Sequence, residues 1–307
     1  MYKILLLIVF CLTFPVADIF AQAESNQFSL FDENELLKHV KSLSSDLFEG
    51  RRTGTKGSAK SRKYIVNQFH TLKVQPLGKS FEQSFSFIEK RKVFEAVNIL
   101  GLIKGTKVPN EYIVISAHYD HEGIKYGKIY NGADDNASGI SALFAFAEYF
   151  KKFPPKHSVI LAAFDGEELG LKGSEYFVKN SIISSNDIIL NMNMDMISRS
   201  DKKELYLVGV SENKKLKDLI INSRQSSVIK LVSGHDGEDN LDNWTYSSDH
   251  ANFYKKGIPF LYFGVEDHKD YHEPTDNYEN IQPEFYTEAV KTIISVFKKI
   301  DDSNTRF

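Results

Sequence analysis

Three short apolar runs, each the length of one buried strand, constrain the fold of this chain most. The runs cover residues 112–117, 158–164 and 188–194, and helical segments with an apolar stripe lie between them at 138–150 and 170–178. Strands without a polar face that alternate with helices are typical of a parallel sheet covered on both sides. The pattern therefore predicts an α/β fold of three layers, with a mostly parallel mixed sheet and helices on both faces.

The rest of the chain fits the same class. Further strands are expected at 93–102, 205–208 and 259–263, and the stretch 81–87 alternates between polar and apolar residues. Three further helices are expected: one at 29–45, a second whose apolar face includes Tyr64 and Phe69, and a third at 285–300. There is no internal repeat and no low-complexity linker, so we expect one domain over residues 24–307. The polar stretch 233–248 is the least regular part and is a candidate active-site loop, because long loops in compact domains are often functional.

Composition excludes some classes of protein. The chain has 307 residues, of which 42% are hydrophobic and 26% charged, as in ordinary globular proteins. The formal net charge is −3, so there is no basic footprint for nucleic acid. We expect no nucleic-acid partner, and we expect a monomer.

The first 23 residues differ from the rest and read as a secretory signal peptide. Lys3 precedes an apolar run over 4–17, and Ala21-Gln22-Ala23 offers a cleavage site between small residues. The run is shorter than the roughly 20 residues that span a bilayer. The only cysteine, Cys11, lies in this segment and follows Phe10, which does not suit lipid attachment. We therefore expect a mature protein without thiolate ligands, free of the membrane, in a bacterial periplasm or secreted.

Acidic and histidine residues follow the three buried runs. His118 comes directly after 112–117, Glu167 and Glu168 follow 158–164, and Asp195 follows 188–194. Ligands bind beyond the carboxyl ends of the strands in a parallel sheet. These side chains are therefore expected at one rim, although adjacent glutamates are also common at a solvated helix start.

Asp134 and Asp135 form an adjacent acidic pair before a tight turn. One interpretation is a cap on the following helix. The other is a metal site, since a divalent cation relieves their repulsion and a shared carboxylate holds two metals about 3.5–4 Å apart. Asp120, two residues after His118, is expected to accept the second imidazole N–H of that histidine. His121 is interpreted as a solvated loop residue.

The donors suit a catalytic metal pair. Of Glu167 and Glu168, one can bind metal while the other acts as general base and acid. His272, in the polar loop 266–277, completes one histidine and one terminal carboxylate for each metal. Nitrogen and oxygen ligands without sulfur suit two Zn²⁺ ions, with Mn²⁺ or Co²⁺ as alternatives.

Four motifs taken together resemble a known family. They are His-x-Asp at 118–120, Gly-Ala-Asp-Asp-Asn-Ala-Ser-Gly at 132–139, Phe-Asp-Gly-Glu-Glu-Leu-Gly-x-x-Gly-Ser at 164–174 and Asn-Met-Asp at 193–195. This set is similar to that of the zinc-dependent exopeptidases of the bacterial leucyl aminopeptidase type, whose relatives include glutamate carboxypeptidase and glutaminyl cyclase. The resemblance covers about residues 30 to 300. It implies the zinc exopeptidase, phosphorylase/hydrolase-like fold and a zinc aminopeptidase that removes N-terminal residues from peptides.

The resemblance also implies roles for single residues. Asp135 would bridge two zinc ions, with a cis peptide bond after it. The remaining metal ligands and catalytic groups are implied as His118 and Asp195 for one zinc, Glu168 and His272 for the other, Glu167 as general base and Tyr271 as oxyanion stabiliser. Asp249, in a Ser-Asp-His element, would support the ligands or cap a helix, and Asp120 would also support the ligands.

Other functions stay open at this point. A glutaminyl cyclase of this type would use one zinc, a carboxypeptidase would share the fold, and a non-enzymatic relative would have lost ligands. The presence of both His118 and Asp195 favours two metals and hence a peptidase. Trp244, Tyr246 and Phe263 are candidate pocket walls, or core residues.

Overall fold

The computed structural model describes residues 29–307 apart from 212, 221–225, 238 and 304. The expected signal peptide at 1–23 lies outside the described residues and stays a prediction. Residues from Phe31 to Phe307 cluster into one compact unit. Within the described part of the chain, every helix is too short or too polar to cross a membrane.

A mixed sheet of nine strands forms the centre of this unit, which confirms the predicted α/β class. Its strand order is β1-β3-β7-β4-β8-β11-β9-β10, and β2 pairs with β3. The four middle strands β7, β4, β8 and β11 are mutually parallel, whereas β3 and β9 join them antiparallel. The strand bounds are β1 Gln75–Pro76, β2 Glu82–Glu89, β3 Lys92–Ile103, β4 Val108–His118, β7 His157–Phe164, β8 Ile188–Met194, β9 Glu204–Val208, β10 Lys230–Ser233 and β11 Phe260–Gly264. A separate hairpin joins β5 (Gly123–Lys125) to β6 (Lys128–Tyr130).

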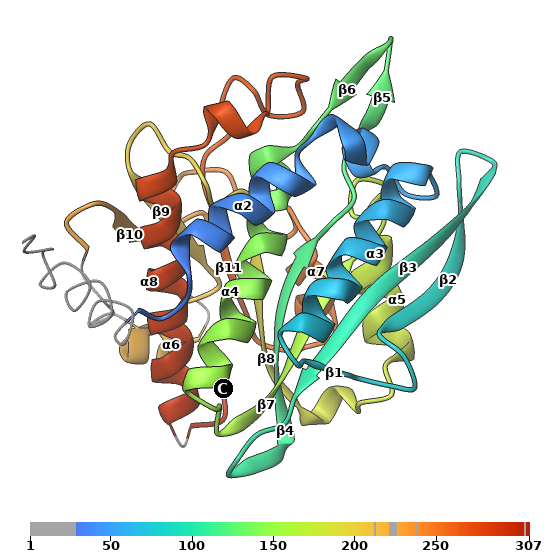
Figure 1. The fold of residues 1–307 in the computed structure, drawn as a ribbon. Coiled ribbons are helices and arrows are strands. Elements are labelled where there is room, and N and C mark those ends of the chain that lie inside the picture. Colours follow the sequence, from blue (N-terminus) through green and yellow to red (C-terminus); the bar gives the residue numbers. More distant parts are fainter. Residues whose placement is uncertain (1–28, 212, 221–225, 238, 304) are drawn as a thin grey trace, which may run out of the picture. The chain divides into compact units, whose positions relative to one another are not determined.

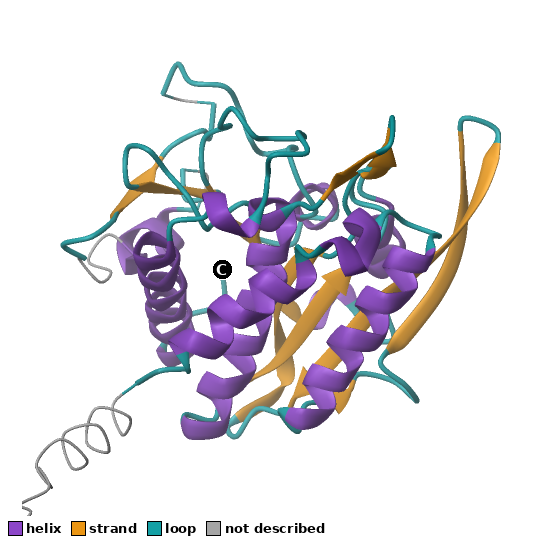
Figure 2. Ribbon diagram, turned by 45° about the horizontal axis from the view of Figure 1, so that its top comes forward, coloured by secondary structure: helices purple, strands orange, loops and turns teal. Residues whose placement is uncertain are grey.

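Helices cover both faces of the sheet. In Figure 1, helices α2, α3, α4 and α8 lie in front of it and α5 and α7 lie behind it; Figure 2 shows the front helices side by side. The helix bounds are α2 Glu33–Leu43, α3 Lys56–Thr71, α4 Gly139–Lys152, α5 Lys172–Asn180, α6 Lys214–Ile220, α7 His250–Lys255 and α8 Pro283–Asp302, with short turns η1 Asp46–Arg51, η2 Ala133–Ser138, η3 Ser185–Asp187 and η4 Tyr278–Asn280.

Burial and capping explain these bounds. Every residue of β7 and β8 is buried, as expected of strands that pack against helices on both faces. Burying each large apolar side chain stabilises the fold by about 1.5–3 kcal/mol. Helix α2 begins at Glu33 rather than at residue 29, because the Asp32 carboxylate accepts the backbone N–H groups of Asn34 and Glu35 and so caps the helix.

The middle of the sheet brings the acidic and histidine residues to one edge. His118 ends β4 and is paired with the last residue of β7, and Asp195 follows β8, whose end pairs with β11. Because these strands are parallel, their carboxyl ends meet at the same edge. The loop after β6 reaches this edge with Asp135, and the peptide bond between Asp135 and Asn136 is cis, as expected.

Candidate metal centre

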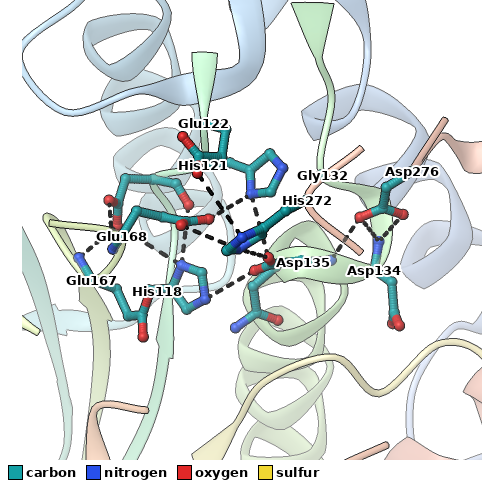
Figure 3. Close-up of polar contacts among 12 residues, drawn as sticks. His118, His121, Glu122, Gly132, Asp134, Asp135, Glu167, Glu168, His272 and Asp276 are labelled. Atoms are coloured by element: carbon teal, nitrogen blue, oxygen red, sulfur yellow. Dashed lines mark hydrogen bonds and ion pairs between the residues drawn. The ribbon is translucent and has the colours of Figure 1, made fainter. Parts of the chain in front are cut away.

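Five predicted ligands lie together in two clusters that share one carboxylate, and Figure 3 labels all of them except Asp195. In the first cluster, His118 Nε2 lies 3.1 Å from Asp195 Oδ1 and 3.2 Å from Asp135 Oδ1. In the second cluster, His272 Nε2 lies 3.1 Å from Asp135 Oδ2 and 3.2 Å from Glu168 Oε2. Asp135 therefore directs one oxygen into each cluster, which is the geometry that a carboxylate bridging two cations requires.

Electrostatics in the first cluster favour a cation. Burial opposes a charge on His118, but the carboxylates of Asp195 and Glu167 outweigh it and raise the pKa of His118 well above its ordinary value. Burial also opposes the charge on Asp135, yet His121 and the hydrogen bond from His118 hold the pKa of Asp135 well below its ordinary value. The carboxylates here thus attract positive charge, which a metal supplies once its ligands lose their protons.

The second cluster behaves in the same way. Burial and the neighbouring Asp135 both oppose the charge on Glu168, but His121 and His272 lower the pKa of Glu168 to about 2. Burial disfavours the charged form of His272, whereas hydrogen bonds to Asp135 and Glu168 raise its pKa to about 11. The carboxylates of Asp135 and Glu168 are therefore ionised at neutral pH and available to a cation.

His121 is buried, so its interpretation as a solvated loop residue is wrong. Its ring is 0% exposed, and Nδ1 lies 2.8 Å from Glu168 Oε1 and 3.5 Å from Asp135 Oδ2. Among the described residues, neither ring nitrogen of His121 has an aligned hydrogen-bond partner, nor does Glu168 Oε1. Buried polar atoms without partners are rare in native structures. Their presence beside a histidine and two carboxylates fits a metal ion at the second cluster.

Glu167 and Glu168 are held from behind by Asp120. The backbone N–H of Glu167 donates to Asp120 Oδ1 at 3.1 Å, and that of Glu168 donates to Oδ2 at 3.3 Å. His118 Nδ1 instead faces the backbone carbonyl of Asp120 at 3.1 Å, while the carboxylate stands 3.8 Å away. The predicted contact is thus made by the main chain, and the carboxylate positions the two glutamates.

Glu167 stands apart from the two clusters in its protonation. Burial and the charges of Asp195 and Glu168 raise the pKa of Glu167 well above its ordinary value, although the charge of His118 opposes this. A carboxyl group with a raised pKa takes up a proton more readily, as a general base does when it accepts one from water. Asp249 lies at the start of α7, fully buried, and burial raises its pKa to about 6.

Asp134 turns away from its neighbour Asp135. Its Oδ1 accepts the backbone N–H and the hydroxyl of Ser198, both at 2.7 Å, and its Oδ2 lies 3.0 Å from His268 Nε2. The Asp276 carboxylate accepts the backbone N–H groups of Asp134 and Asp135. Asp134 and Asp276 therefore fix the loop that carries Asp135. Neither role was predictable, because both depend on contacts with distant segments.

A cavity of about 320 Å³ opens onto the centre and is lined by Glu167, Asp195 and His272. Of the three expected pocket walls, Trp244 lines this cavity, Phe263 is fully buried in β11, and Tyr246 is exposed. The loop 233–248 contributes further lining residues, Asp242, Asn243 and Ser247.

Tyr271 also lines the cavity, with its ring stacked on His272 at 4.0 Å between centroids. Burial and the charge of Asp135 raise the pKa of Tyr271 above its ordinary value. The phenol therefore stays protonated at neutral pH and can donate a hydrogen bond into the cavity.

Comparisons with known proteins agree with this geometry. The sequence matches the family described as Peptidase family M28 over residues 98–297. Aminopeptidase YwaD of Bacillus subtilis is 30% identical over 205 residues, which are 62% of this chain and 42% of YwaD. The chain spans less than half the length of the first curated relatives it matches.

Two solved structures share the fold. BSAP, a zinc aminopeptidase from Bacillus subtilis, superposes with a TM-score of 0.69 at 18% identity, covering 88% of this chain and 95% of BSAP. The glutaminyl cyclase of Porphyromonas gingivalis superposes with a TM-score of 0.70 at 16% identity, covering 88% of this chain and 99% of the cyclase. At such low identities, these likenesses establish the fold alone.

Proposed function

This chain belongs to peptidase family M28, and from that premise we propose that it is an aminopeptidase with two zinc ions, which hydrolyses N-terminal residues from peptides. The observation that carries the proposal is Asp135, whose two oxygens point into separate ligand clusters. A site for a single metal has no need of that arrangement. His118 and Asp195 would complete one zinc, and Glu168 and His272 the other.

The zinc pair, when bound, would supply Lewis-acid chemistry for the scissile carbonyl and for the attacking water. Glu167 would take the proton from that water and pass it to the leaving amine. Tyr271 would donate a hydrogen bond to the oxygen that gains negative charge. Asp242 and Asp267, which line the same cavity, would receive the free ammonium group of the substrate.

The test is the substitution Glu167→Gln, which keeps the shape of the side chain and removes the base. We expect turnover to fall by about 10²–10⁴-fold while two zinc ions per chain remain bound. Activity on leucine p-nitroanilide and metal analysis after dialysis would measure both quantities. Glu168→Gln is the matched control, and it should lose zinc together with activity. Full activity in Glu167→Gln would refute the assignment of the base.

Glutaminyl cyclase is the second candidate, since the fold extends over 99% of the cyclase from Porphyromonas gingivalis. A one-zinc cyclase has no use for the first cluster, yet His118 and Asp195 stand 3.1 Å apart here. Metal analysis separates the two functions, because one zinc per chain together with cyclisation of an N-terminal glutamine would favour the cyclase.

We also propose that the protein acts outside the cytoplasm, in a periplasm or the medium. The support is the signal-peptide pattern at 1–23 alone. N-terminal sequencing of the exported protein checks this, with cleavage after Ala23 as the expected result.

A further inference from the structure

A second cavity, of about 580 Å³, borders the metal centre at Glu168. It shares no lining residue with the first cavity, but the two are neighbours, because Glu167 lines the first and Glu168 lines the second. A peptide bond held at these two glutamates therefore has both cavities next to it.

Cationic side chains from three separate segments converge on this second cavity. Arg52 follows η1, Lys90 lies in the turn between β2 and β3, Lys92 begins β3, and Lys172 begins α5. The hairpin of β2 and β3 projects at the edge of the sheet in Figure 1. Four cationic groups thus outnumber the carboxylates among the lining residues, which are Glu89 and Glu168.

The positive charge of the second cavity is only partly balanced. Arg52 pairs with Glu122 at 3.0 Å, and Lys172 Nζ stands 3.8 Å from Glu175. Lys92 Nζ lies 4.8 Å over the ring of Phe94, which also lines the cavity. An aromatic face holds an ammonium group in place without removing its charge. Lys90 and Lys92 are exposed and therefore free to meet an incoming anion.

The first cavity has the opposite charge. Asp242 and Asp267 line it in addition to the carboxylates of the centre, and no lysine or arginine is among its described lining residues. Trp244 Nε1 donates to Asp242 Oδ2 at 3.0 Å and so orients that carboxylate. The metal centre is therefore bordered by an acidic cavity and by a basic cavity.

We propose that the substrate is a short peptide that lies across both cavities, with its ammonium end in the acidic cavity and a carboxylate of the leaving portion in the basic cavity. This rests on the proposed aminopeptidase function. A free peptide carries these two charges at its ends, so the charge pattern aligns it in one direction. The reverse orientation would place like charges together and is disfavoured. We expect the C-terminal carboxylate to be the group recognised; an acidic side chain after the scissile bond offers the same chemistry.

Four compounds test the inference: Leu-Gly, Leu-Gly amide, Leu-Asp amide and the blocked dipeptide N-acetyl-Leu-Gly. We expect kcat/KM for Leu-Gly to exceed that for its amide by about five- to tenfold, the effect of one or two exposed charge pairs. The double variant Lys90→Ala/Lys92→Ala should bring the ratio close to one, mainly through KM for Leu-Gly. Lys104→Ala/Lys107→Ala is the matched control, since both lysines are exposed and lie before β4, at the end of the strand away from His118. It should keep the ratio.

The possible outcomes distinguish a failure of the substrate orientation from a failure of the aminopeptidase function. Equal efficiency on Leu-Gly and its amide would overturn the inference and leave the aminopeptidase intact. Leu-Asp amide cleaved as well as Leu-Gly would support carboxylate recognition through the side chain. Failure to hydrolyse the three compounds with a free amino terminus, and leucine p-nitroanilide as well, would refute the proposed function itself. Faster cleavage of N-acetyl-Leu-Gly than of Leu-Gly would overturn both, because it reverses the direction of attack.

Discussion

Arg51 is a buried cation that connects the segments around the metal centre. Its guanidinium donates to the backbone carbonyls of Tyr119, Leu43, Asn131 and Gly132 at 2.6–2.9 Å. Burial lowers the pKa of Arg51 to about 10, while nearby carboxylates oppose that effect, so the side chain stays charged at neutral pH. The carbonyl of Tyr119 directly follows His118, and those of Asn131 and Gly132 precede the loop of Asp135. Arg51 therefore fixes these two segments relative to each other.

Replacing Arg51 should weaken the fold strongly. Arg51→Met leaves four buried carbonyls without donors, so we expect the free energy of unfolding to fall by about 3–5 kcal/mol. Arg51→Lys keeps the charge but reaches fewer carbonyls, so its free energy of unfolding should lie between that of Arg51→Met and that of the parent. Urea denaturation measures both. Arg91→Met, at an exposed position of the β2–β3 turn, is the control and should change stability by about 0.5 kcal/mol or less. An Arg51→Met variant as stable as that control would contradict the role.

His121 should support metal binding at the second cluster, because its Nδ1 lies 2.8 Å from Glu168 Oε1. We expect His121→Ala to weaken zinc binding at one of two sites by about 10–100-fold, the usual cost of losing a group next to a ligand. Calorimetric titration of the metal-free protein resolves the two sites. The exposed His70→Ala is the control. If His121→Ala left the zinc affinities of both sites unchanged, His121 would have no role in metal binding.

At the scale of helices and strands, the buried elements were predictable and the short ones were not. The predicted strand 188–194 coincides with β8, and 158–164 differs from β7 by one residue. An apolar run with no polar face has few alternatives to a buried strand. The β5–β6 hairpin and β10 were missed, because strands of three or four residues with mixed polarity carry no period. Strand β9 joins the sheet antiparallel to β11, and this direction depends on pairing with a distant strand, which the local sequence pattern does not encode.

The same distinction applies to the metal centre. Residues at the end of a buried strand or directly after it, such as His118 and Asp195, were predicted together because parallel strand ends meet at one edge. The family suggested by the motifs is confirmed by the match over 98–297. Arg51 was missed because its partners are carbonyls, which every residue has. His121 was missed because its neighbours in sequence say nothing about its burial.

His39, in helix α2, should make the free energy of unfolding depend on pH. Burial lowers the pKa of His39 from 6.5 to about 4. Between those values the unfolded chain binds more protons than the folded chain, so the free energy of unfolding falls as pH falls through this window. His39→Phe removes the group that causes this loss. The free energy of unfolding of the variant, relative to that of the parent, should therefore rise by about 3 kcal/mol as the pH falls from 6.5 to 4.

Urea denaturation at several pH values measures this difference. The exposed His70→Phe in α3 is the matched control and should follow the parent. A constant difference between His39→Phe and the parent across the window would show that His39 does not titrate as its burial implies.

At the scale of the whole molecule, the metal centre concentrates buried negative charge in the sheet. Asp135, Glu168 and Asp195 lie within two touching clusters. Without metal their mutual repulsion opposes folding, and a cation that binds the folded chain alone stabilises it. The stability of the protein should therefore depend on free zinc.

We expect removal of zinc by a chelator to lower the free energy of unfolding by about 2.7 kcal/mol per site, relative to free zinc at about 100 times Kd. Urea denaturation in zinc buffers measures it. Glu168→Gln should show about half the response, because one cluster is impaired. A response of zero in the parent would mean that the clusters bind no metal in the folded state.

The order of the strands has a consequence for biosynthesis. Strand β11 is the last to be made, yet it lies between β8 and β9 in the finished sheet. While the ribosome is still translating the segment before residue 260, one edge of β8 has no neighbour, and an open edge of an apolar strand pairs readily with other chains. This edge of β8 is therefore covered only once β11 has been made, and His272 follows β11 in the chain. The sheet and the set of predicted ligands are thus both completed by residues 260–272.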